Sequence, residues 1–340
     1  MQRDEYPAVG PGLPSRLLAE IRALTSIPRL RQVEKAVSAQ DGFAKYLFRG
    51  DGPELFEAVR IPLLHRPDDE KYVVCVSSQV GCAMGCIFCA TARMVHRRNL
   101  AAWEMVDQVA RIRADSAHPV RGVVFMGMGE PLLNYDAVLT AAAVLSESCG
   151  MAIAGKAITI STVGIVPGIR RLAAERHSYR LIVSLTSADA AQRRALMPVE
   201  AAYPTPELML AIREYHAATR RRVTLAWTMI AGINTRPEDA RMLAELTRGL
   251  PIKLDLIDVN DPTGRFQPPT PAELRAFRDA LRESLPMPVA RRYSGGQDIR
   301  AGCGMLAATS VGRDSPAGSS HSRFGPQRAA GGSDSSIKTG

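Results

Sequence analysis

Residues 72–89 read YVVCVSSQVGCAMGCIFC, and this stretch decides how the 340-residue chain is organised. Tyr72–Val76 is an apolar run of the kind that forms a buried strand. The polar and glycine-containing residues after it predict a loop, which carries three thiols in the spacing Cys82-x-x-x-Cys86-x-x-Cys89. The sequence therefore predicts a buried strand with a cluster of cysteines at its carboxyl end.

Downstream of this loop, apolar strands alternate with amphipathic helices. Alternation of this kind implies right-handed βαβ units around a parallel sheet. About six repeats are too few for a closed eight-fold barrel, so we expect an α/β fold of partial (β/α)6 barrel type, with function at the carboxyl ends of the strands. Strands are predicted at 122–126, 157–161, 180–185, 223–230, 254–259 and 289–293, and helices at 101–114, 135–147, 167–174, 206–218, 237–248 and 271–284.

The two ends of the chain differ from this repeat. Residues 15–24 and 31–47 carry apolar residues at helical spacing, residues 54–62 alternate as a strand does, and residues 67–69 form a turn signal. The last residues are rich in Gly, Ser and Arg, a composition typical of disorder. We therefore predict an accessory region at 1–66, a catalytic core at 67–308 and a disordered tail at 309–340.

Composition and charge narrow the class of protein. Hydrophobic residues make up 46% of the chain, enough for a sizeable core, and no run is long and apolar enough to span a membrane. Because the first residues lack the pattern of a secretory signal, we expect a cytoplasmic protein. The formal net charge of +9 suits a polyanionic partner such as nucleic acid, with Arg97 and Arg98 as candidate phosphate contacts and the run Arg220–Arg222 as a solvated face.

The cysteine cluster admits two kinds of chemistry. In a reducing compartment, three thiols within eight residues bind metal or react more often than they form disulfides. Thiolates suit zinc or iron–sulfur clusters, and three thiolates on a four-iron cluster leave one iron open to a substrate or cofactor. A structural zinc site would instead need a fourth ligand, for which Cys75 and Cys303 are the candidates.

Further motifs make the chain resemble a known family. They are CVSSQVGC leading into the cluster (75–82), FMGMGEPLLN (125–134), TISTVGIVP (159–167) and GGQDIRAGCG (295–304). Together with the cysteine spacing they closely resemble the RlmN/Cfr family of radical S-adenosylmethionine (SAM) enzymes, which methylate adenine in ribosomal and sometimes transfer RNA. The resemblance covers about residues 40–308.

The resemblance implies a mechanism and a set of roles. Cys82, Cys86 and Cys89 would hold a [4Fe-4S] cluster that binds SAM, and Cys303 would carry the methyl group as S-methylcysteine to an adenine ring carbon, C2 rather than C8. Cys75 would release the product through a transient Cys75–Cys303 disulfide. Glu57 would accept a proton. The partners implied are an RNA substrate and an electron donor such as flavodoxin or ferredoxin, with the chain acting as a monomer.

The same resemblance indicates where SAM would bind. A glycine permits close backbone approach, and a carboxylate suits the ammonium group of SAM. One position departs from the family, which has His where this chain has Thr186. The SAM contacts implied are Gly129, Glu130, Ser161, Ser184, Leu185, Thr186 and Asn260.

Two other functions remain open from the sequence. One is a radical SAM enzyme that acts on a substrate other than RNA and uses Cys303 differently. The other is a non-catalytic RNA-binding protein with a zinc or iron–sulfur site. Either radical SAM enzyme should contain iron and cleave SAM under reduction, whereas bound zinc without SAM cleavage would indicate the non-catalytic RNA-binding protein.

Overall fold

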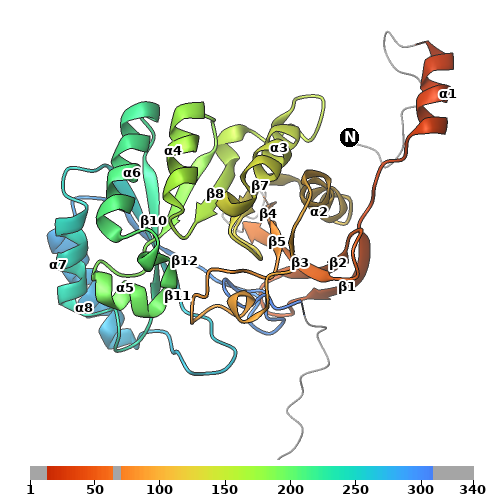
Figure 1. The fold of residues 1–340 in the computed structure, drawn as a ribbon. Coiled ribbons are helices and arrows are strands. Elements are labelled where there is room, and N and C mark those ends of the chain that lie inside the picture. The colour runs from red at the N-terminus through yellow and green to blue at the C-terminus, as the bar shows by residue number, and fades with distance from the viewer. Residues whose placement is uncertain (1–13, 64–69, 309–340) are drawn as a thin grey trace, which may run out of the picture. The chain divides into compact units, whose positions relative to one another are not determined.

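The computed structural model describes residues 14–63 and 70–308. Within them, ten strands form one sheet in the order β1-β2-β3-β4-β7-β8-β9-β10-β11-β12 (Figure 1). The turn predicted at 67–69, the domain boundary at 66 and the tail at 309–340 lie outside the described residues. The strands are β1 (Arg31–Val37), β2 (Ala44–Arg49), β3 (Leu55–Leu63), β4 (Lys71–Cys75), β7 (Val120–Phe125), β8 (Ile158–Thr162), β9 (Arg180–Ser184), β10 (Val223–Met229), β11 (Ile252–Asp258) and β12 (Val289–Arg292).

The predicted fold class is confirmed. Seven strands pair in parallel, each with the next: β4, β7, β8, β9, β10, β11 and β12. A helix follows each of the first six of them. The first and last strands in the order, β1 and β12, do not pair with each other, so the barrel stays open. The six helices are α2 (Ala102–Ala114), α3 (Tyr135–Ser146), α4 (Val166–Glu175), α6 (Thr205–Thr219), α7 (Pro237–Leu246) and α8 (Pro271–Ser284).

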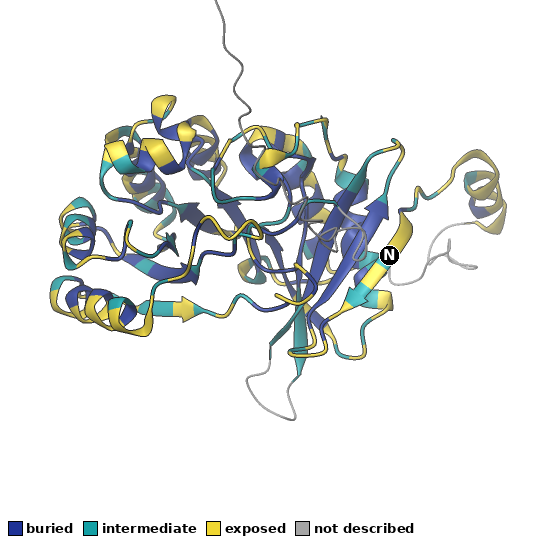
Figure 2. Cartoon of the chain, turned by 90° about the horizontal axis from the view of Figure 1, so that it is seen from below, coloured by how far each residue is buried: buried dark blue, intermediate teal, exposed yellow. Residues whose placement is uncertain are grey.

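The core lies between the sheet and these helices. Helices line the outer side of the curved sheet in Figure 1, and Figure 2 shows the middle strands mostly buried, whereas the edge strands β1 and β12 and the outer faces of the helices are exposed in part. Phe125 in β7, Trp227 in β10 and Phe277 in α8 are among the largest fully buried side chains. Burial of apolar area on this scale is the main force holding the strands in register, which fixes their carboxyl ends.

The helix predicted over residues 31–47 is wrong. These residues form an antiparallel hairpin of β1 and β2, and β2 continues through β3 into the main sheet. The turn holds Asp41-Gly42, with Gly42 at φ +72°, and an Asp-Gly pair is a strong hairpin signal that the helical spacing concealed. The helix predicted at 15–24 is confirmed as α1 (Ser15–Leu24).

Short elements enclose the loop that carries the thiols. The pair β5 (Gln79–Val80) and β6 (Arg98–Asn99) closes its base. Between β9 and α6, where the sequence predicted neither a helix nor a strand, the chain forms α5 (Ala190–Leu196). Single 3-10 turns are η1 (Thr91–Arg93), η2 (Pro131–Asn134), η3 (Gly155–Ala157) and η4 (Pro198–Ala201). Among the described residues, no helix is long and apolar enough to cross a membrane.

Candidate active site

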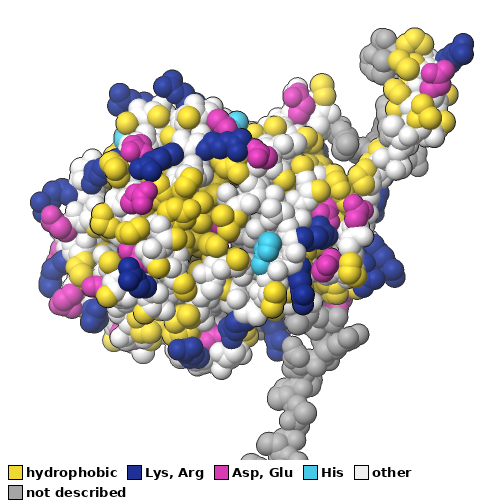
Figure 3. All heavy atoms as spheres, in the orientation of Figure 1, with side chains coloured by type: hydrophobic (Ala, Val, Ile, Leu, Met, Phe, Trp, Pro, Cys, Tyr) yellow, Lys and Arg dark blue, Asp and Glu magenta, His cyan; other side chains and the backbone are white. Residues whose placement is uncertain are grey.

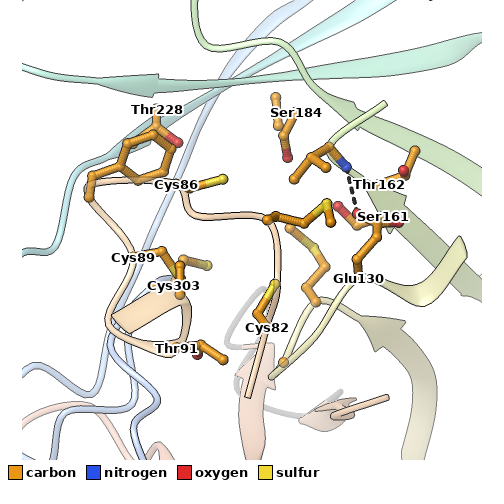
Figure 4. A pocket seen from close by; sticks show the side chains of 18 of the residues that line it. Cys82, Cys86, Cys89, Thr91, Glu130, Ser161, Thr162, Ser184, Thr228 and Cys303 are labelled. Atoms are coloured by element: carbon orange, nitrogen blue, oxygen red, sulfur yellow. Dashed lines mark hydrogen bonds between the residues drawn. The ribbon is translucent and has the colours of Figure 1, made fainter. Parts of the chain in front are cut away.

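A cavity of about 150 Å³ opens at the carboxyl ends of the parallel strands. The three loop thiols line it from one side, and residues from the ends of β7, β8, β9 and β11 line it from the other (Figure 4). Parallel strands place their carboxyl ends at one rim, which explains why residues so distant in sequence meet there. The predicted residues in this lining are Cys82, Cys86, Cys89, Gly129, Glu130, Ser161, Ser184, Asn260 and Cys303.

A second cavity, of about 120 Å³, shares part of its lining with the first. Cys75 lines it together with Arg292, and both Cys89 and Cys303 line the two cavities. Burial, together with the nearby Cys303 sulfur, raises the pKa of the Cys75 thiol to about 12, while Arg292 favours the thiolate. Cys75 and Cys303 are therefore brought to one place by the fold.

None of the six cysteines forms a disulfide bond in this structure, so a disulfide is not supported as a standing feature of the fold. Burial raises the pKa of Cys82 to about 12 and raises that of Cys86 as well. Metal binding requires the thiolates, so loading iron would release these protons. No three His, Cys, Asp or Glu side chains in the described ranges are grouped as ligands of one metal ion.

The three loop thiols fit a larger group than a single ion. They face a shared cavity rather than one point, and three thiolates are the ligand set that leaves a four-iron cluster one open iron. Glu130, Ser161 and Ser184 supply oxygen atoms on the opposite side of that cavity. The donor set thus suits a cluster with a polar cofactor beside it.

The end of β7 holds a buried carboxylate. The oxygens of Glu130 accept hydrogen bonds from the backbone N–H groups of Leu132 (3.0 Å) and Val163 (2.8 Å). Burial raises the pKa of Glu130 to about 7, against the effect of these donors. Gly129 precedes it at φ +100°, and a Cβ there would lie 2.5 Å from Cβ of Gln79. Only glycine fits this turn.

The segment that carries Cys303 is held by hydrogen bonds on both sides of the thiol. Ser294 Oγ accepts from the Cys303 N–H at 3.0 Å, and the Asn260 side-chain amide donates to the Cys303 carbonyl at 3.2 Å. From the cysteine loop, the N–H of Ala90 donates to the Gly304 carbonyl at 2.7 Å. Asn260 therefore has a supporting role besides its place in the cavity lining.

Three of the residues predicted for catalysis or SAM binding lie outside both cavity linings. Leu185 and Thr186 are fully buried, and Thr186 adopts φ +62°, a conformation that costs a β-branched residue free energy. Glu57 is fully buried in β3 and forms an ion pair with Lys45. Arg98, expected as a phosphate contact, instead pairs with Glu104 at 2.7 Å, because Glu104 lies within reach at the start of α2.

A buried arginine that the sequence did not single out connects the site's strand ends. Arg193 in α5 is fully buried and donates to the carbonyls of Leu185 (3.1 Å) and Val163 (2.7 Å). Its third partner is the Glu200 carboxylate, at 2.5 Å. Val163 in turn holds Glu130. Arg193 thus joins the ends of β8 and β9 behind the cavity.

We expect Arg193→Met to lower the free energy of unfolding by about 3–5 kcal/mol, because it leaves Glu200 buried without a counter-charge. Urea denaturation of the metal-free protein measures this. The neighbouring Arg194, which is exposed, provides the control: Arg194→Met should change stability by less than about 0.5 kcal/mol. Equal, small changes in the free energy of unfolding for the two substitutions would show that Arg193 does not stabilise the ends of β8 and β9.

The positive charge is not gathered on the face shown in Figure 3. There, Lys and Arg side chains lie mostly towards the periphery, interspersed with Asp and Glu, while apolar side chains occupy the middle. Arg97 remains exposed beside the cysteine loop. The net charge of +9 therefore does not by itself define a nucleic-acid site.

Comparison with known proteins agrees with this geometry. The sequence profile of the Radical SAM superfamily matches residues 76–246. A crystal structure of a radical SAM methyltransferase from Sphaerobacter thermophilus is similar at a TM-score of 0.80 and 38% identity, covering 88% of this chain and 87% of that one. Fold and site together define a radical SAM enzyme, a class that uses SAM and a [4Fe-4S] cluster.

Two curated relatives narrow the class. A probable RNA methyltransferase of Myxococcus xanthus is 53% identical over 300 residues, 88% of this chain and 82% of its own length. The dual-specificity RNA methyltransferase RlmN of Syntrophobacter fumaroxidans is 43% identical over 279 residues, 81% of this chain and 80% of its own length. The chain belongs to the RlmN-type family of radical SAM RNA methyltransferases.

Proposed function

We propose that this chain methylates an adenine ring carbon of ribosomal RNA, transfer RNA or both, C2 in preference to C8, and that the methyl group passes through Cys303. One observation supports this best: Cys303 lines the cavity of the loop thiols and Glu130 and also the cavity of Cys75. A methyl carrier must meet the methyl donor on one side and the substrate and resolving thiol on the other. The position of Cys303 meets both requirements.

Cys82, Cys86 and Cys89 would hold the [4Fe-4S] cluster. When bound, cluster and SAM supply a 5′-deoxyadenosyl radical, made with one electron from a donor such as flavodoxin or ferredoxin. The contacts to SAM would come from Gly129, Glu130, Ser161, Ser184 and Asn260, with the Glu130 carboxylate facing the ammonium group. Leu185 and Thr186 would support this set from behind, because they are buried at the end of β9.

The protein's own groups would act as follows. The Cys303 thiolate would attack the methyl carbon of one SAM and become S-methylcysteine, with S-adenosylhomocysteine as the leaving group. After that methyl carbon has lost a hydrogen atom and bonded to the adenine ring, Glu57 would accept the proton that leaves the ring carbon. The unpaired electron left on the ring would return to the bound cluster, which would supply that one-electron chemistry. Cys75 then attacks the Cys303 sulfur: an S–S bond forms, the C–S bond breaks, and the released carbon takes up a proton to complete the methyl group.

A radical route suits this substrate. Adenine C2 and C8 are poor nucleophiles, so direct displacement on SAM should fail there, whereas a carbon radical adds without a nucleophile. We further propose that residues 1–66 form an accessory region, and that one chain is sufficient, because every residue in the proposed roles comes from the same chain.

The test uses anaerobically reconstituted protein, a reductant, SAM labelled in its methyl group, and RNA from cells that lack the enzyme. The RNA is digested to nucleosides, which are separated and identified by mass spectrometry. We expect label in 2-methyladenosine. Label in 8-methyladenosine would overturn the choice of carbon, and label only on exocyclic nitrogen or ribose would overturn the radical mechanism.

A further inference from the structure

A buried lysine lies behind the candidate active site. Lys45 in β2 is 4% exposed, and its Nζ lies 3.0 Å from Oε1 of Glu57, which is 0% exposed in β3. Lys45 pairs with Val59 in the antiparallel register, so Glu57 is its diagonal neighbour on the same face of the sheet. An ammonium group that loses its hydration needs a partner, and Glu57 provides it.

The second oxygen of Glu57 holds the polypeptide that carries Cys303. Oε2 accepts a hydrogen bond from the Ala307 N–H at 2.9 Å, four residues after Cys303 in the chain. The carbonyls of the same segment are held from the other side, where the Thr91 hydroxyl donates to Leu306 at 2.6 Å. The Cys303 segment thus lies between the cysteine loop and Glu57.

We propose that Lys45 is a positioning residue: it holds the Glu57 carboxylate against the Ala307 amide and thereby fixes the segment that carries Cys303. Charge assistance strengthens the bond from an amide to a carboxylate, and the Lys45 ammonium supplies the counter-charge that a buried carboxylate needs. That Cys303 is the methyl carrier rests on the proposed function, but the tie from Lys45 through Glu57 to Ala307 does not.

The arrangement also has a consequence for Glu57. Each of its oxygens already has a partner, Lys45 Nζ on one and Ala307 N–H on the other. The charged Lys45 ammonium is the stronger of these two partners and the uncharged amide is the weaker. Each oxygen of Glu57 keeps a second lone pair for a further donor.

The test measures hydrogen–deuterium exchange of the Ala307 amide in the anaerobically purified full-length protein, without RNA or added SAM. We expect exchange at Ala307 to quicken at least about tenfold in Lys45→Met, and to stay within about threefold of the original in Lys45→Arg, which keeps the charge. In the presence of SAM, methyl loading of Cys303, measured by mass spectrometry, should fall in Lys45→Met and recover in Lys45→Arg.

The matched control is Lys35→Met. Lys35 lies in the neighbouring strand β1, and the substitution removes its ion pair with Asp115 (2.6 Å). It should leave exchange at Ala307 unchanged. A second arm combines Lys45→Met with Glu57→Gln, which avoids an unpaired buried charge: in the Glu57→Gln background, Lys45→Met should add no further change at Ala307.

Unchanged exchange in Lys45→Met, or an equal rise in Lys35→Met, would overturn the role of Lys45. So would an undiminished effect of Lys45→Met when Glu57 is already Gln. Failure of the proposed function looks different: exchange at Ala307 would respond as expected, but Cys303 would take up no methyl group from SAM.

Discussion

Replacing Cys303 by alanine is expected to abolish RNA methylation, by at least about a thousandfold, while SAM is still cleaved to 5′-deoxyadenosine. The thiol is the group that would carry the methyl carbon, and no other cysteine lines both cavities except Cys89, which is assigned to the cluster. Labelled methyl groups in RNA and 5′-deoxyadenosine measured by chromatography report the two activities separately.

The control for this prediction is Cys149→Ala. Cys149 is an exposed cysteine after α3 that lines neither cavity, and its replacement should leave both activities intact. RNA methylation at the original rate in Cys303→Ala would remove Cys303 from the mechanism. Loss of SAM cleavage as well would move its role to cofactor binding.

Replacing Cys75 by alanine is expected to stop the enzyme after one turnover, with RNA bound covalently to Cys303. Without the second thiol, no sulfur is available to attack Cys303 and break the bond between its sulfur and the transferred carbon. The adduct should survive denaturation and shift the protein on a gel until ribonuclease is added. Peptide mapping should then find the remaining nucleotide on Cys303.

Normal multiple turnover in Cys75→Ala would exclude this residue as the resolving thiol. An enzyme that methylates nothing and traps nothing would instead indicate that Cys75 acts before the RNA is bonded. Cys75→Ala should also lower the free energy of unfolding by about 1 kcal/mol, because Cys75 is buried and the smaller alanine leaves a void. The iron content should not change.

The sequence predicted the parallel part of the fold well because its signals are local. Apolar runs bounded by turn residues mark β4 and β7 to β12, and apolar residues at helical spacing mark the helices between them. The sequence also predicted that the loop thiols and the strand-end residues lie near one another, because parallel strands have their carboxyl ends at one rim of the sheet.

What the sequence did not reveal depends on contacts between distant residues. The hairpin of β1 and β2 was concealed because a strand buried on both faces has no alternating pattern, as the burial of Ala44, Tyr46 and Phe48 together with Lys45 and Leu47 shows. Lys45 reads as an ordinary surface lysine until β3 places Glu57 beside it. The role of Arg193 likewise depends on the carbonyls of Val163 and Leu185, which follow β8 and β9 and are brought beside it only by the fold.

The central claim is that the methyl group reaches RNA by way of Cys303, and a pulse–chase experiment tests it most directly. The protein is first incubated with methyl-labelled SAM and freed of it, and then receives unlabelled SAM, a reductant and RNA. We predict label on the Cys303 peptide before the chase and label in the RNA after the first turnover. Unlabelled methyl groups in the first RNA product, with the label still on Cys303, would contradict the account.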